Sequence, residues 1–288
     1  MWQAVTSSSD GVKLVAAVDP GYIYTSNDSG GTWIQRTNTS QSWFWLASSS
    51  DGSKVIGVQN SGYIYTSNDS GVTWIKSNQF NTSSTWASVA CDINCTKIVA
   101  NVGFGGLIYT SNDSGAMWTA RTNTAESWNN VASSSDGTTL AAAVYGGFIF
   151  TSNDSGVTWT QRGSSGNWNT LASSSSGTKL AAAQYGGYIY TSNDTGVTWT
   201  QQTNASKYWT ATACDTTCTK IVAAEDGNSK GGYIHISNDS GVTWVQGMVI
   251  GNYKSLACDS TCTKIVAVMY GGYIWTSNDG GVTWNISY

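Results

Sequence analysis

A box with the pattern S-x-D-x-G-x-T-W recurs along the chain and constrains its fold more than any other feature. The aspartate of the box stands at Asp28, Asp69, Asp113, Asp154, Asp194, Asp239 and Asp279, at intervals of 41, 44, 41, 40, 45 and 40 residues. Seven copies of this length account for all 288 residues and leave no room for a second domain. The fold is therefore built from one structural unit of about 41 residues that recurs seven times.

The copy at residues 128–162 shows how one repeat divides into strands. Four segments, WNNVASS, TLAAAVY, FIFTS and VTWTQR, are separated by the turn sequences SDG, GG and NDSG. This pattern predicts an all-β fold: a single seven-bladed β-propeller over residues 1–288, with four antiparallel strands per blade and one box between the third and fourth strands. The expected blades cover approximately residues 1–37, 38–80, 81–123, 124–163, 164–204, 205–248 and 249–288.

The two ends of the chain fall at the ends of repeats. Trp2 opens a first strand, and residues 283–288 form a fourth strand. We therefore expect each blade to be one contiguous repeat, with no strand exchanged between the two ends of the chain. The ring would then close through the face between the first and last blades.

The composition excludes several classes of partner. Charged residues make up 10% of the chain and the net charge is −4, so no basic stripe is available for nucleic acid or an anionic membrane. No apolar run is long enough to insert into a membrane, and MWQAVTSSSDG lacks the pattern of a leader. We expect either a removed leader or no export by that route.

The box resembles the Asp-box, or bacterial neuraminidase repeat, of sialidases, sortilin-type propellers, some glycosidases and a photosystem II assembly factor. Six copies carry the full pattern, and the third, SNDSGAMW, has Met117 in place of threonine. The resemblance covers all 288 residues. It implies the propeller fold and little about activity, because those families share the box and differ in function.

The box is interpreted as a structural device. Its aspartate can accept hydrogen bonds from backbone N–H groups one to three residues ahead, its glycine permits positive φ, and its tryptophan can pack between sheets. A catalytic residue needs a singular environment, which seven equivalent copies do not provide. Calcium binding by the box aspartates is the alternative; we expect no metal and no cofactor.

Six cysteines form three pairs with the same spacing: Cys91 with Cys95, Cys214 with Cys218, and Cys258 with Cys262. They replace residues equivalent to Ser48 and Gly52, which flank the turn between the first and second strands, so their Cβ atoms can approach closely. Three local disulfides and a secreted or cell-surface location follow. Reduced cysteines in a cytosolic protein are the alternative.

The residues do not assemble into an enzyme site. The three arginines, Arg36, Arg121 and Arg162, lie in the outermost strand and cannot converge as a sialidase triad requires. Four acids lie outside the boxes and turns: Asp19, Glu126, Glu225 and Asp226. None forms a well-placed pair for glycoside hydrolysis. We expect no enzymatic activity, and we expect His235 to serve packing.

The variable segments lie on one face, where fourth strands connect to the next first strands and second strands turn into third strands. Aromatic residues repeat there beside Asn, Gln, Ser and Thr, a combination typical of sugar binding. The candidate ligand-binding residues are Trp43, Trp86, Trp128, Trp168, Trp209 and Tyr253 at the starts of first strands, and Tyr145, Tyr185 and Tyr270 in turns. The alternative is that the first-strand aromatics are wedges between blades.

The sequence thus favours a non-enzymatic extracellular binding module. A lectin-like role is the leading hypothesis, in which shallow pockets between blades recognise a multivalent glycan surface. The alternative is a structural or protein-binding scaffold, either as a domain of a larger protein or in a surface assembly. An assembly factor similar to the photosystem protein, or a glycosidase, is less favoured.

Overall fold

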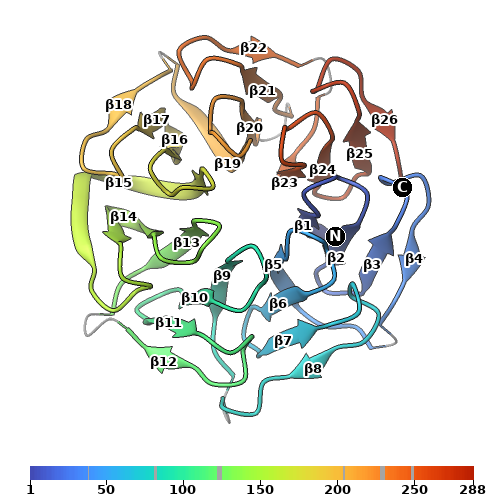
Figure 1. Ribbon diagram of the computed structural model, residues 1–288. Helices are drawn as coiled ribbons and strands as arrows, with labels where there is room; N and C mark the ends of the chain where they lie inside the picture. Colours follow the sequence, from blue (N-terminus) through green and yellow to red (C-terminus); the bar gives the residue numbers. More distant parts are fainter. Residues whose placement is uncertain (38, 81–82, 122–124, 204, 228–230, 248–249) are drawn as a thin grey trace.

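The computed structural model describes every residue except 38, 81–82, 122–124, 204, 228–230 and 248–249. The described residues form antiparallel β-strands arranged in a ring around a central axis (Figure 1). There is no helix among them, so none that could cross a membrane. The predicted all-β class is confirmed.

Four separate sheets contain four strands each, in sequential order. The first two are β1 (Trp2–Ser7), β2 (Leu14–Val18), β3 (Ile23–Ser26) and β4 (Ile34–Gln35), then β5 (Trp43–Ser48), β6 (Val55–Gln59), β7 (Ile64–Ser67) and β8 (Ile75–Lys76). The other two are β9 (Trp86–Cys91), β10 (Ile98–Val102), β11 (Ile108–Ser111) and β12 (Thr119–Ala120), and β23 (Tyr253–Cys258), β24 (Ile265–Met269), β25 (Ile274–Ser277) and β26 (Asn285–Ile286).

A fifth sheet joins ten strands from the intervening repeats. Its strands are β13 (Trp128–Ser133), β14 (Leu140–Ser152), β15 (Thr160–Ser173), β16 (Leu180–Gly187), β17 (Ile189–Ser192), β18 (Thr200–Gln201), β19 (Lys207–Cys214), β20 (Ile221–Glu225), β21 (Ile234–Ser237) and β22 (Val245–Gln246). The long strands β14 and β15 each cover two of the strands that the sequence predicts.

The tight turn predicted at residues 146–147 is present within β14: Gly146 has φ of +74°, and a Cβ atom on Gly147 would lie 2.5 Å from the Val144 Cγ1, three residues back in the chain. β14 runs through it with shifts of register, and Gly147 pairs with Gly166 in the connector to the next repeat. The same link is a single bridge elsewhere, as between Gly21 and Gln41 or Gly62 and Ser84. Backbone pairing thus links a turn of this kind to the following connector. Where the pairing extends beyond a single bridge, the sheets of neighbouring repeats merge.

Apolar clusters lie between neighbouring repeats. One contains Ala4, Val15 and Ile23 from the first repeat with Trp43 and Val55 from the second. The small residues of the second strands are almost fully buried, because these strands are covered by sheets on both faces. Each sheet is therefore held by side-chain packing against its neighbours.

Two features close the ring between the two ends of the chain. Val266, Val268 and Ile274 of the last repeat pack against Trp2 and Leu14 of the first. The turns between first and second strands are also joined in a cycle, in which the N–H of one repeat donates to the carbonyl oxygen of the next. The seven bonds are Ser9 to Ser50, Ser50 to Ile93, Ile93 to Ser135, Ser135 to Ser175, Ser175 to Thr216, Thr216 to Ser260 and Ser260 to Ser9.

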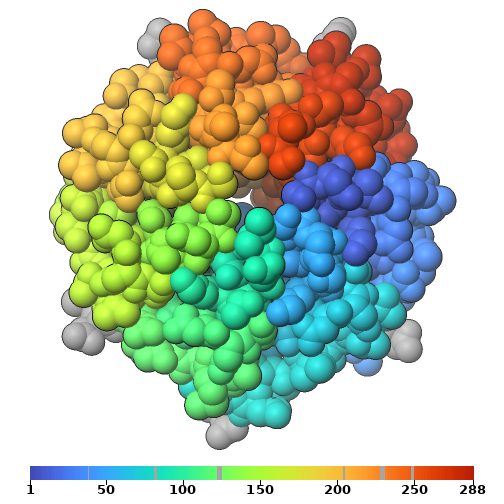
Figure 2. All heavy atoms as spheres, viewed as in Figure 1, coloured from blue at the N-terminus to red at the C-terminus, as the bar shows by residue number. Residues whose placement is uncertain are grey.

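No strand is exchanged between the ends among the described residues, as predicted: the first sheet contains only residues 2–35 and the last only residues 253–286. The final residue nonetheless reaches the first repeat. The ring of Tyr288 lies 5.4 Å from that of Trp2 and 5.3 Å from that of Tyr24. The centre of the ring is hollowed (Figure 2).

Candidate ligand-binding site

The six first-strand aromatics proposed as ligand contacts are buried between sheets. Their exposed fractions are 1% for Trp43, Trp86, Trp168 and Trp209, 2% for Trp128 and 0% for Tyr253. Five of them contact a ring on the third strand of their own repeat, with centroids 5.1 to 5.5 Å apart. All six therefore pack as the wedges of the alternative interpretation, and two of them, Trp86 and Trp128, also line the cavity described below.

The three turn tyrosines have different surroundings. Tyr145 is 46% exposed and Tyr185 is half-buried, and both line the same cavity. Tyr270 is 50% exposed and lies outside that cavity, with the Lys254 Nζ 5.3 Å from the centre of its ring. Four of the nine predicted residues therefore line the cavity: Trp86, Trp128, Tyr145 and Tyr185.

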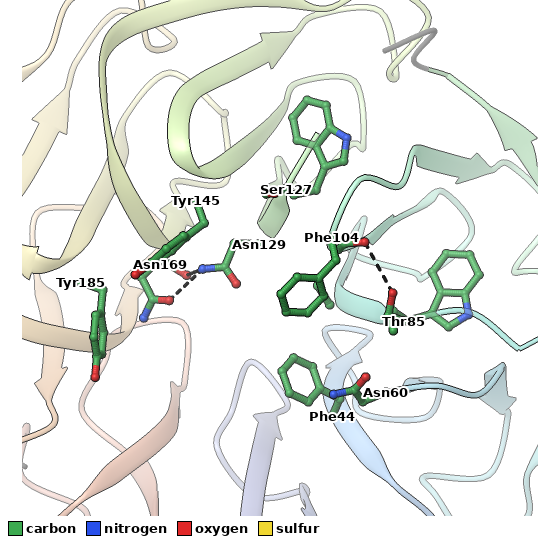
Figure 3. Close-up of a pocket in the computed structure, with 13 residues that line it drawn as sticks. Phe44, Asn60, Thr85, Phe104, Ser127, Asn129, Tyr145, Asn169 and Tyr185 are labelled. Atoms are coloured by element: carbon green, nitrogen blue, oxygen red, sulfur yellow. Dashed lines mark hydrogen bonds between the residues drawn. The ribbon is translucent and has the colours of Figure 1, made fainter. Parts of the chain in front are cut away.

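The cavity has a volume of about 360 Å³ and lies on the predicted face (Figure 3). Residues of the second, third, fourth and fifth repeats line it. It is formed by the starts of first strands and by the turns between second and third strands. Its lining consists of Phe44, Asn60, Thr85, Trp86, Ala87, Gly103, Phe104, Ser127, Trp128, Asn129, Tyr145, Asn169 and Tyr185. None of these residues is charged, so the site is suited to a neutral ligand.

Phe44 was missing from the predicted site, and Phe104 lies in a turn of the kind that carries the predicted tyrosines. Phe104 is 89% exposed at the tip of the turn between β10 and β11, with φ of +51°. Phe44 follows Trp43, at a position where other repeats have Gln3, Ala87 or Asn129. Departure from the repeat was the available signal, because residues that maintain the common scaffold are the ones that recur.

Two asparagines at this same position link three repeats. The Asn129 Nδ2 donates to the Asn169 Oδ1 at 2.7 Å, and the Asn169 Nδ2 donates to the Trp209 carbonyl oxygen at 2.7 Å. The Asn129 Nδ2 also lies 3.3 Å from the carbonyl oxygens of Trp168 and Asn169. These bonds fix both amides at the wall of the cavity.

A buried charged cluster lies farther round the same face. The Lys207 Nζ donates to both Glu225 oxygens at 2.9 and 2.8 Å, and the His235 Nε2 lies 3.1 Å from Glu225 Oε1. Burial raises the pKa of Glu225, but hydrogen bonds from His235 and Lys207 lower it more, so this pKa lies below its ordinary value. His235 also packs against Trp209, as expected from its place in a third strand.

The neighbouring acid has a different partner. The Asp226 Oδ2 lies 3.8 Å from the Lys254 Nζ, while Glu225 pairs with Lys207. The two carboxylates therefore diverge, as predicted. The three arginines are held in the outer strands, where each Nε donates to a threonine of its own third strand: Arg36 to Thr25, Arg121 to Thr110 and Arg162 to Thr151.

The box closes a turn at the opposite end of the strands. In the first repeat, Asp28 accepts from the Ser26 hydroxyl at 2.7 Å and from the Thr32 N–H and hydroxyl at 2.8 and 2.7 Å. The backbone donor is thus four residues ahead, not one to three as predicted. Gly30 has φ of +89°, as its position required.

The other repeats have the same box bonds, and Met117 keeps only the backbone one. Hydrogen bonds from Thr32 and Ser26 lower the pKa of Asp28 to about 2. Among the described residues, no three His, Cys, Asp or Glu side chains are grouped as metal ligands.

The three predicted disulfides, Cys91–Cys95, Cys214–Cys218 and Cys258–Cys262, are present, with Cα–Cα distances of 4.9, 4.9 and 4.8 Å. The second cysteine of each pair occupies the place of a glycine such as Gly52. Cys95 has φ of +47° where Gly52 has +65°. The disulfide thus replaces glycine at a left-handed turn position.

Comparisons with known proteins bear on the fold. No family model and no curated protein matches the sequence. A GH74 enzyme of Niastella koreensis has 17% identity and a TM-score of 0.82, over 99% of this chain and 54% of the enzyme. This chain therefore spans about half the length of that enzyme.

Two other structures are similar over nearly their whole length. YCF48 bound to D1 peptide has 16% identity and a TM-score of 0.72, over 94% of this chain and 91% of YCF48. The Cps50 (Swd1) beta-propeller domain of Myceliophteria thermophila has 12% identity and a TM-score of 0.72, over 95% of this chain and 96% of the domain. At these identities the comparisons establish the architecture alone: the chain folds as a β-propeller.

Proposed function

We propose that this protein is a non-enzymatic, lectin-like binding module whose cavity takes a neutral sugar ring. The observation that carries the proposal is the combination of aromatic side chains and fixed amides in a cavity without charged groups. Phe44, Phe104, Tyr145 and Tyr185 supply apolar faces for the C–H groups of a sugar ring, and Asn129 supplies a polar group for a hydroxyl.

The structure argues against the multivalent arrangement expected from the sequence. The aromatics that were to form equivalent pockets between repeats are buried, and the cavity is built from residues that differ between repeats. We therefore propose one principal site per chain. Its carboxylate-free lining also favours binding over hydrolysis, because glycoside hydrolysis uses a pair of carboxyl groups at the scissile bond.

The test is a glycan array followed by calorimetric titration of the best ligands. We expect millimolar or tighter affinity for a neutral glycan, no release of reducing ends, and at least about a tenfold loss of affinity in Phe104→Ala. Tyr273→Ala is the matched control, because Tyr273 is 53% exposed and lies outside the cavity lining. Absence of binding to every neutral glycan at millimolar concentration would refute the proposal.

A second candidate is a protein-binding scaffold. It is favoured by Phe104, which is 89% exposed and could enter an apolar pocket of a partner, and by the similarity to YCF48 bound to D1 peptide. A peptide array tests it with the same two variants. Peptide binding lost in Phe104→Ala, together with no response to glycans, would favour the scaffold over the lectin.

We further infer that the ring has seven blades, each closed by an Asp-box turn of the kind described above. Seven boxes in the sequence and the cycle of seven hydrogen bonds support this count. We also propose a secreted or cell-surface location, supported by the three disulfides. Secretion of the tagged protein with all cysteines oxidised would support it.

A further inference from the structure

The orientation of the Asn129 side chain is determined by its neighbours. Its amide faces the carbonyl oxygens of Trp168 and Asn169, which can only accept hydrogen bonds. The –NH₂ group must therefore point toward them, because the reverse orientation would bring oxygen against oxygen. In the same way, the carbonyl oxygen of Trp209 fixes the –NH₂ group of Asn169.

This arrangement gives the two amides a direction. Each –NH₂ group donates toward the following repeat, and the Asn169 Oδ1 accepts from Asn129. The Asn129 Oδ1 is the amide oxygen that accepts no hydrogen bond from the other asparagine. It points away from Asn169 toward the open part of the cavity (Figure 3). No donor to this oxygen is found within the described part of the chain.

The remaining wall of the cavity adds no cation. The lining residues are aromatic, small or neutral and polar, and Thr85 lies with its hydroxyl 3.5 Å from the Gly103 carbonyl oxygen. Lys207, at the start of β19 in the sixth repeat, is engaged by Glu225. A carboxylate or sulfate placed beside Asn129 would thus meet a carbonyl oxygen without a compensating charge.

We propose that Asn129 is a specificity-determining residue that accepts a hydrogen bond from a hydroxyl group of the ligand and rejects anionic glycans. The inference rests on the proposed glycan-binding function and names its ligand class: neutral sugars, including N-acetylated ones. The fixed amide requires a donor, because burying its oxygen against an acceptor or an apolar group leaves it unpaired.

A fluorine scan tests this role. Fluorine in place of a hydroxyl cannot donate a hydrogen bond and changes the size of the sugar little. The probes are methyl glycosides of glucose, galactose, mannose and N-acetylglucosamine, their monofluoro counterparts, and their 6-sulfated or uronic acid forms. We expect one fluorinated position to weaken binding to the unaltered protein about 3- to 10-fold, and we expect no binding of the anionic probes.

Variants then assign the effect to one atom. In Asn129→Ala the loss caused by that fluorine should fall below about twofold, because its acceptor is gone. Asn60→Ala is the matched control, since it removes another amide of the cavity and should retain the discrimination. Thermal unfolding of each variant establishes that it folds. If a variant does not fold, the scan on the unaltered protein still tests whether the site requires a hydroxyl donor and rejects anionic probes.

The outcomes separate the two proposals. Binding of neutral sugars with no fluorine-sensitive position, or equal sensitivity in Asn129→Ala, would overturn the role of Asn129 and leave glycan binding intact. Preference for sulfated or uronic probes would do the same. Failure of every sugar to bind would overturn the proposed function, and the ligand class with it.

Discussion

Replacement of Trp128 by alanine separates a wedge from a binding platform. Trp128 is 2% exposed and lies between repeats, packed with Ile108 of the third repeat and Val131 and Val144 of the fourth. Its ring centroid is 5.2 Å from that of Phe150. The substitution would remove an almost fully buried indole ring and leave a cavity that its neighbours can only partly fill.

The expected cost follows from the buried area. A tryptophan buries about 200 Å² on folding, worth about 5 kcal/mol at about 25 cal/mol per Å², and measured Trp→Ala losses are about 3–5 kcal/mol. With an entropy of unfolding of about 2.1 cal/mol/K per residue, 288 residues give about 0.6 kcal/mol/K. A loss of 4 kcal/mol should then lower the Tm by about 7 °C.

The assay is thermal and urea unfolding of Trp128→Ala beside Phe104→Ala. Phe104 is 89% exposed, so its removal should change the free energy of unfolding by no more than about 0.5 kcal/mol and reduce ligand binding instead. A stability loss below about 1 kcal/mol in Trp128→Ala, combined with loss of binding, would show that the wedge assignment is mistaken.

Three further results are expected. Reduction should add two hydrogens for each of the three disulfides in the intact mass, and the double variant Cys91→Ser/Cys95→Gly, which restores the residues of other repeats, should lose at most about 2 kcal/mol. A hydrogen-bonded threonine lowers the pKa of Asp154 to about 2, below its unfolded value near 4. Its contribution to stability is therefore present above pH 4 and lost as the pH falls toward 2, so Asp154→Asn should flatten the decline of Tm in that window; an unchanged slope would contradict this. Glu225 likewise has a lowered pKa, so its pairing with Lys207 should stabilise the fold above the ordinary glutamate pKa and weaken as acid protonates it, and Glu225→Gln should abolish that pH dependence of unfolding.

Much of the fold could be predicted from residues close together in the sequence. The period of the box, the turn chemistry of Ser26 and Asp28, and the cysteine pairs each involve bonds within about five residues, so local pattern was sufficient. The face that carries the cavity followed as well, because antiparallel strands place alternate turns at opposite ends of a sheet. The tight turn at residues 146–147 also followed from its two glycines, whereas its backbone pairing with Gly166 in the next connector did not.

The site itself required the tertiary structure. Whether Trp128 is a wedge or a platform depends on which side chains of the preceding repeat, about 20 to 40 residues away in the chain, pack against it. A sequence pattern does not show which residues so far apart are in contact. The cavity arises because the ring brings Phe44, Phe104 and Tyr145, which come from three different repeats, into the lining of one space. The sequence alone therefore determined the repeated scaffold, whose stabilising bonds are local. The tertiary structure decided the proposed binding surface, because the ring brings together the residues at which the repeats differ.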